Sequence, residues 1–172
     1  MPITLHEGLN PLDASLIPVY VLPSRYEHYA TRDDYSYAFH SSIWQAQTFI
    51  PATTHKITSV KLKLWKEGSP GTVTISIRAT DGRGHPTGGD LCSGTINGNT
   101  ISGESPGAWY EITLGAGYTL NASTKYAIVA RSEGKDLYNS AKWRCDITSP
   151  TYFKGNKERS TNSGVSWTSL TS

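Results

Sequence analysis

A chain of 172 residues can fill one hydrophobic core but is short for two domains. Its sixteen basic and fourteen acidic side chains give a net charge of +2, which excludes the strongly basic surface of a protein that holds nucleic acid by its phosphates. No apolar run approaches the length of a membrane span, and the N-terminus lacks the basic start and the continuous apolar run of a secretory signal.

Residues 1–33 differ from the rest of the chain. They carry four prolines and show no regular alternation, which is typical of an arm or an extended edge segment. One apolar segment, 15–22, interrupts them and is the part best suited to form a strand. Its apolar side chains are Leu16, Ile17, Val19, Tyr20, Val21 and Leu22. The sequence therefore predicts an N-terminal arm over 1–33 and one domain over 34–172.

Regular alternation of apolar and polar side chains begins after the arm. Residues 57–65 and 71–80 place apolar side chains at every second position, which indicates two half-buried antiparallel strands. The residues between them, 67–71, have the composition of a turn. We therefore expect these two strands to pair as a hairpin.

Shorter strands are expected around this pair. Residues 126–130 are apolar on both faces, which predicts a central strand. A long loop is expected over 81–89, because glycine, proline and aspartate dominate it. The other expected strands cover 44–50, 91–96, 108–114, 125–131, 142–145, 152–154 and 165–168. Seven to nine strands without a helix predict an all-β protein, an antiparallel β-sandwich of the jelly-roll kind.

The sequence offers little sign of catalysis. None of the five histidines stands at ligand spacing with another on one element, and all are expected as solvated side chains in loops or in the arm: His6, His28, His40, His55 and His85. There is no Gly-x-Ser-x-Gly motif. A glycosidase would need a pair of catalytic carboxylates. The candidates for such a pair are expected at turns or at outward-facing positions: Glu104, Glu111, Glu133 and Glu158. We expect a protein that is not an enzyme and needs no cofactor.

Two residue pairs have alternative interpretations. Asp81 and Asp90 could hold calcium together with backbone carbonyls of the loop between them, or the loop could be a plain connection. Cys92 and Cys145 could form one long-range disulfide in an oxidising compartment, or could be two small buried side chains.

Aromatic side chains gather at the start of the domain. Tyr26, Tyr29, Tyr35 and Tyr37 lie close together in the sequence, and tyrosine favours surfaces that meet sugars or other proteins. They are therefore a candidate ligand surface. The alternative is that alternate members of the group fill the interior of the sandwich.

Several segments of the domain are similar to one family. Residues 44–49, 57–64, 68–78 and 124–129, with 155–156 and 163–167 as a closing region, resemble jelly-roll β-sandwich modules of phage and prophage virion proteins and of large bacterial and archaeal surface proteins. The resemblance implies the fold and no catalytic residue. Members of the family usually continue past the closing region into one more apolar strand, whereas this chain stops at Ser172.

The resemblance suggests how the arm is used. Without that strand we expect an open sheet edge, which the segment 15–22 could fill as a donor strand, in its own chain or in a neighbour. Pro18 would then have to lie at a strand end or an outer edge. The expected function is a structural subunit of an extracellular or virion assembly, such as a decoration protein, a tail protein or a surface filament. Its partners would be copies of itself or other virion or surface proteins; the alternative is a carbohydrate-binding module or adhesin that binds glycans.

Overall fold

The fold is known from a computed structural model that describes residues 24–28 and 32–170. The domain contains ten strands and one short 3₁₀ turn in these residues. The strands are β1 (Tyr35–Phe39), β2 (Trp44–Phe49), β3 (His55–Glu67), β4 (Thr72–Thr80), β5 (Pro86–Asn97), β6 (Ala108–Leu120), β7 (Tyr126–Ser132), β8 (Ser140–Cys145), β9 (Lys157–Ser160) and β10 (Thr168–Leu170). The 3₁₀ turn covers Gly98–Thr100.

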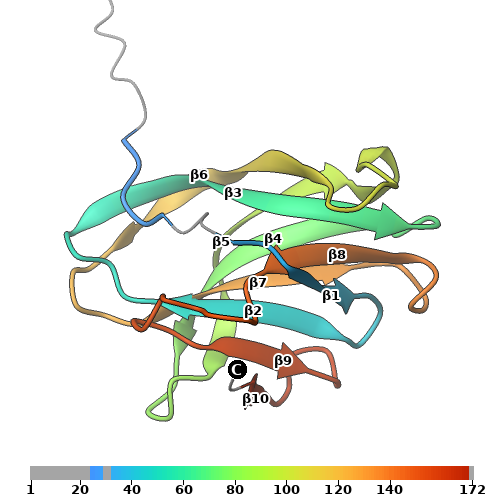
Figure 1. The fold of residues 1–172 in the computed structure, drawn as a ribbon. Helices are drawn as coiled ribbons and strands as arrows, with labels where there is room; N and C mark the ends of the chain where they lie inside the picture. The colour runs from blue at the N-terminus through green and yellow to red at the C-terminus, as the bar shows by residue number, and fades with distance from the viewer. Residues whose placement is uncertain (1–23, 29–31, 171–172) are drawn as a thin grey trace, which may run out of the picture.

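The first eight strands pair as one long hairpin that has been rolled up. β4 pairs with β5, β3 with β6, β2 with β7 and β1 with β8, all antiparallel. Rolling divides these strands between two sheets. One sheet has the order β1-β8-β3-β6, and the other has the order β10-β9-β2-β7-β4-β5 (Figure 1). The predicted all-β antiparallel sandwich is confirmed, and its nested pairing is that of a jelly roll.

The core lies between the two sheets. Alternate side chains of β3, β4 and β6 point into it, as the period-two pattern predicts. Its most buried members include Leu64, Val73, Ile75, Ile77, Ile112, Leu114 and Leu120, none more than 1% exposed. β7 lies between β2 and β4 and is buried on both faces, so the prediction of a central strand there is confirmed.

The predicted hairpin between residues 57–65 and 71–80 is wrong. β3 pairs with β6 and β8, whereas β4 pairs with β5 and β7 in the other sheet. The turn between them therefore crosses from sheet to sheet. At its start Gly68 has φ +52, and a Cβ there would lie 2.3 Å from the Tyr138 carbonyl oxygen. Turn composition is the same for a hairpin and for a crossing, so sequence could not distinguish them.

Three other expectations differ from the structure. Strand β5 begins at Pro86, so half of the predicted loop 81–89 belongs to a strand. Strands β1 and β9 were not predicted, and residues 152–154 form no strand. β9 has the sequence Lys-Glu-Arg-Ser, which carries no apolar alternation because its buried residues, Glu158 and Ser160, are polar.

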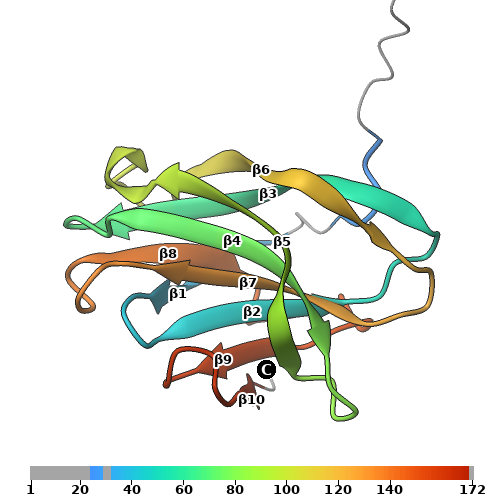
Figure 2. The ribbon, with the colours of Figure 1, turned by 180° about the vertical axis from the view of Figure 1, so that it is seen from behind.

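The sandwich is closed on one side by the approach of β5 to β6. Gly94 of β5 makes this approach possible, because a Cβ there would lie only 1.9 Å from the Thr113 carbonyl oxygen of β6. In Figure 2, β5 curves away from the other strands of its sheet, and the turn that leads into it lies near β9. On the opposite side of the sandwich, β1 is an edge strand of the four-stranded sheet.

We predict that Gly94→Ala lowers the free energy of unfolding by about 1–3 kcal/mol, because the added methyl group forces β5 and β6 apart. Urea denaturation of the full chain measures the effect. Gly89→Ala on the same strand is the matched control, since a Cβ there meets nothing within 4 Å. Equal stability of the two variants would show that the β5–β6 approach is not tight.

Candidate functional site at the open edge of β1

The two sheets have unequal widths. β6 faces β4 and β5, and β1 faces β2 and β7, so β9 and β10 extend beyond the edge of the four-stranded sheet. Figure 1 shows β9 and β10 as the outermost strands on that side. The result is a step: β1 forms its wall, and the inward face of β9 and β10 forms its floor. We call this feature the β1 step.

The strand register shows which side chains form the floor of the β1 step. Gln45 of β2 faces inward, because its Nε2 donates a hydrogen bond to the Ala38 carbonyl oxygen of β1 at 2.9 Å. Arg159 is the register partner of Gln45, and Lys157 is the partner of Gln47, so both cations face the same way. Thr168 and Leu170 of β10 lie beside them. The floor therefore carries two cations, an alcohol and an apolar side chain.

Lys157 is the most unusual group of the β1 step. Its Nζ is buried, has no hydrogen-bond partner among residues 24–28 and 32–170, and lies over the ring of Tyr37. Burial lowers the pKa of Lys157 to about 7. Burial also raises the pKa values of its neighbours Tyr37 and Cys145. Tyr37 and Cys145 are therefore uncharged near neutral pH, and Lys157 is about half charged at pH 7.

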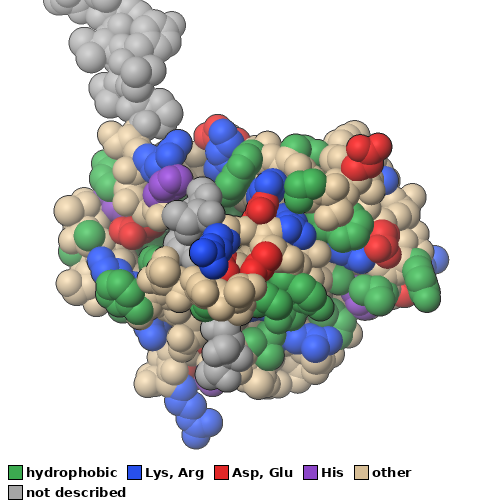
Figure 3. Space-filling model, viewed as in Figure 1, with side chains coloured by type: hydrophobic (Ala, Val, Ile, Leu, Met, Phe, Trp, Pro, Cys, Tyr) green, Lys and Arg blue, Asp and Glu red, His purple; other side chains and the backbone are tan. Residues whose placement is uncertain are grey.

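The wall of the β1 step is aromatic. Tyr35 and Tyr37 project from β1 on one face, with ring centroids 4.9 Å apart in a T-shaped arrangement, and Tyr35 is 46% exposed. Figure 3 shows hydrophobic side chains gathered in the region of β1, with basic side chains nearby. A groove of about 190 Å³ continues along the floor, lined by Arg159, Thr161, Ser166, Thr168 and Leu170.

The backbone of β1 offers unpaired groups to the β1 step. In the described part of the chain β1 pairs only with β8. A residue of an antiparallel strand directs its N–H and C=O to the same side. The Ala38 carbonyl accepts from β2 of the other sheet and so points away from β8. Ser36, two residues earlier, has the same orientation, and its N–H and C=O face the open edge.

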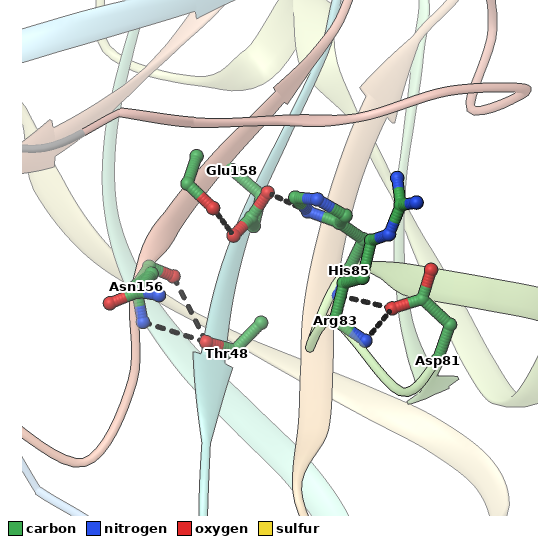
Figure 4. Close-up of polar contacts among 7 residues, drawn as sticks. Thr48, Asp81, Arg83, His85, Asn156 and Glu158 are labelled. Atoms are coloured by element: carbon green, nitrogen blue, oxygen red, sulfur yellow. Dashed lines mark hydrogen bonds and ion pairs between the residues drawn. The ribbon is translucent and has the colours of Figure 1, made fainter.

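A buried carboxylate holds β9 in place. Glu158 is 1% exposed, accepts a hydrogen bond from Ser169 Oγ at 2.6 Å, and has its Oε2 2.8 Å from His85 Nδ1 (Figure 4). These contacts join β9, β10 and the β4–β5 turn on the outer face. Glu158 points to the outer face, as expected, but it lies in β9 and is buried there, and His85 lies in the expected loop but is paired with Glu158 instead of being solvated. Sequence could not place two residues 73 positions apart together.

The predicted calcium ligands are each bound by protein groups. Asp81 accepts hydrogen bonds from the backbone N–H groups of Arg83 and His85, both at 2.9 Å, which shapes the β4–β5 turn and lowers the pKa of Asp81 (Figure 4). Asp90 accepts from Arg78 at 2.8 Å and from Arg131 at 2.5 Å. The described residues contain no group of three His, Cys, Asp or Glu that could hold a metal ion.

The other predicted site residues are spread over the domain. Cys92 lies on β5 and Cys145 ends β8, and both are free thiols in the structure. Tyr26 stacks on His55 with centroids 3.7 Å apart, at the β2–β3 end. The structure thus separates Tyr26 from the Tyr35–Tyr37 pair. Tyr29 and the arm residues Leu16, Ile17, Val19, Tyr20, Val21 and Leu22 lie outside the described residues.

Comparison with known proteins adds no family. A scan against protein-family models finds no match, and a search of curated proteins finds none either. Over residues 24–28 and 32–170, no helix has the length and apolar character required to traverse a bilayer.

We predict that His85→Ala lowers the free energy of unfolding by about 1–3 kcal/mol, because the buried Glu158 carboxylate loses a partner. Thermal and urea denaturation measure the effect. His28→Ala is the control, since His28 is exposed and its Nε2 lies 3.3 Å from Arg25 Nη1. The double variant His85→Ala with Glu158→Gln should lose less free energy of unfolding than the sum of the losses in the two single variants. Strict additivity would contradict the pairing.

Proposed function

We propose that this chain is a structural subunit, without catalytic activity, of an extracellular or virion assembly, and that it associates by strand addition at the β1 step. The observation that carries the proposal is the open edge of β1 above the floor of β9 and β10, which no described strand of the four-stranded sheet covers. An unpaired edge is a template for a further strand. The family resemblance of residues 34–168 supports a virion or cell-surface setting.

The proposed donor is the apolar segment 15–22 of a neighbouring copy. Its main-chain groups would pair with Ser36, and alternate side chains would cover Tyr37 and the floor of the β1 step. An apolar strand suits this floor because the buried Lys157 amine can lose its charge near neutral pH. Pro18 would occupy the outer side of the added strand, where its missing N–H costs no ladder bond.

We predict that Ser36→Pro in the full chain abolishes assembly, because it removes a backbone donor from the open edge without removing a β1–β8 hydrogen bond. Light scattering after size exclusion, over a range of concentrations, should show oligomers of the parent chain and a folded monomer of the variant. Ser36→Ala is the matched control: it also loses the hydroxyl that accepts from Trp65 Nε1 but keeps the N–H, and should assemble like the parent.

Deletion of residues 1–23 separates donor from acceptor. The deleted chain should be monomeric but should bind a synthetic peptide of residues 12–24, and Ser36→Pro should weaken that binding. A full chain that stays monomeric at every concentration would overturn the assembly proposal. A deleted chain that assembles normally would overturn the role of the arm.

We also predict that assembly depends on pH through Lys157. Donor binding buries the amine further and lowers its pKa below 7, so protonation opposes assembly as the pH falls through 7. Going from pH 8 to pH 6 should weaken association about tenfold, the change in the uncharged fraction of a group with a pKa of about 7. Tyr37 and Cys145, which face Lys157, stay neutral in this range because their pKa values are raised.

Variants of Lys157 test the cause of this dependence. Lys157→Met should assemble equally at both pH values, and Lys157→Arg should assemble weakly at both, since arginine keeps its charge. Arg159 and His40 also lie near this region, and burial lowers the pKa of His40. A pH dependence that persists in Lys157→Met would assign the effect to such a group and contradict the prediction. Sedimentation velocity measures each association constant.

A further inference from the structure

A second surface lies away from the β1 step, on the outer face of the six-stranded sheet. A groove of about 260 Å³ opens there where β2, β4 and β7 meet, lined by Ser41, Trp44, Thr72, Thr74, Arg131 and Glu133 among others. Its volume is just below the roughly 300–1,000 Å³ of pockets for drug-sized ligands, so the groove suits a smaller unit. Its walls combine one indole ring with hydroxyl groups and charges of both signs.

Contacts on several sides hold the indole of Trp44 in place. Its Nε1 donates to the Ser41 carbonyl oxygen at 3.1 Å, and the guanidinium carbons of Arg78 and Arg131 each lie 5.2 Å from the ring centroid. The β9–β10 loop packs against the ring, because a Cβ at Gly164 would lie 2.6 Å from it. Ligand binding to this ring would therefore cost the Trp44 side chain little conformational freedom.

The charged groups are also fixed and balanced. Arg131 donates to both carboxylate oxygens of Asp90, at 3.3 and 2.5 Å, and to Ser76 Oγ at 3.0 Å. Asp90 is shared with Arg78. Glu133 accepts from the backbone N–H of Thr72 at 2.9 Å, which lowers the pKa of Glu133 and keeps it ionised. Two guanidinium groups thus stand against two carboxylates.

This chemistry selects a class of ligand. An anion is disfavoured, because the arginines are already paired with Asp90 and the exposed Glu133 carboxylate would repel it. A cation would compete with two guanidinium groups for the indole. A neutral polyol fits: its hydroxyls can donate to Glu133, whose carboxylate has several lone pairs, and exchange hydrogen bonds with Thr74. Its C–H face can pack on the part of Trp44 that lines the groove.

We propose that this groove binds a neutral sugar residue of a glycan, with Trp44 as the apolar wall, Glu133 as the acceptor for sugar hydroxyls, and Thr74 as a further hydrogen-bonding group. The site does not depend on strand addition, because the groove lies on the outer face and the β1 step lies between the sheets. It also differs from the tyrosine surface expected from sequence. The chain would then combine a surface for assembly with a surface for adhesion.

Saturation-transfer difference NMR on the full chain tests the proposal, since the method suits weak ligands and large assemblies. The probes are methyl glucoside, methyl galactoside, methyl mannoside and N-acetylglucosamine, with sialic acid and inorganic phosphate as anionic probes. A single sugar ring should bind with a dissociation constant of about millimolar order, as its few atoms allow. We expect a signal from at least one neutral sugar and none from either anion.

Two variants localise the binding without disturbing the packing of Trp44. Glu133→Gln and Thr74→Val should each raise the dissociation constant about tenfold, the effect of losing a hydrogen bond to a charged or well-placed partner. Glu104→Gln and Thr113→Val are the matched controls at exposed positions outside the groove and should bind like the parent. Absence of binding by every neutral sugar, stronger binding of an anion, or unchanged affinity in both groove variants would each overturn the proposal.

Discussion

The nested pairing of eight strands is the constraint on which the rest of this structure depends. It starts at the β4–β5 turn, where Asp81 binds the backbone N–H groups of Arg83 and His85, and it ends with β1 against β8. Every connection of β1–β8 other than β4–β5 crosses between the two sheets, and β1–β8 is the outermost pair of the nesting. β1 is therefore left at an edge by the topology itself, whereas β5 and β6 meet and close the opposite side.

The added strands β9 and β10 make that edge a candidate site. They extend the six-stranded sheet beyond β1, so that an edge strand gains a floor beneath it. Alternation along β9 gives its neighbouring side chains opposite roles. Glu158 points outward and ties the strand to His85 and Ser169, while Lys157 points inward under Tyr37. The contacts of Glu158 hold β9 in its position in the sheet, and the Lys157 amine contributes a titratable charge to the floor of the β1 step.

Sequence was a good guide to strands and a poor guide to their partners. Local alternation in β3, β4 and β6 reports which side chains are buried, because a half-buried strand has a period of two wherever it lies. It carries no record of which strand lies beside it, and so the turn at Gly68 was misread as a hairpin. β9 escaped prediction because its buried positions are polar. Its burial rests on contacts with His85, 73 residues away, which no local window contains.

The same limit explains which site residues could be foreseen. Asp81 and Asp90 stand out in the sequence as acidic residues of a glycine-rich segment, yet the fold uses each as an acceptor for protein donors. Lys157 and Trp44 acquire their character only from neighbours on other strands. A lysine is unusual when it is buried without a hydrogen-bond partner, and a tryptophan can form a wall when arginines and a loop hold it. An open edge between the sheets and a polar groove outside them are therefore independent products of one topology, so one domain can present two surfaces without a compromise in its core.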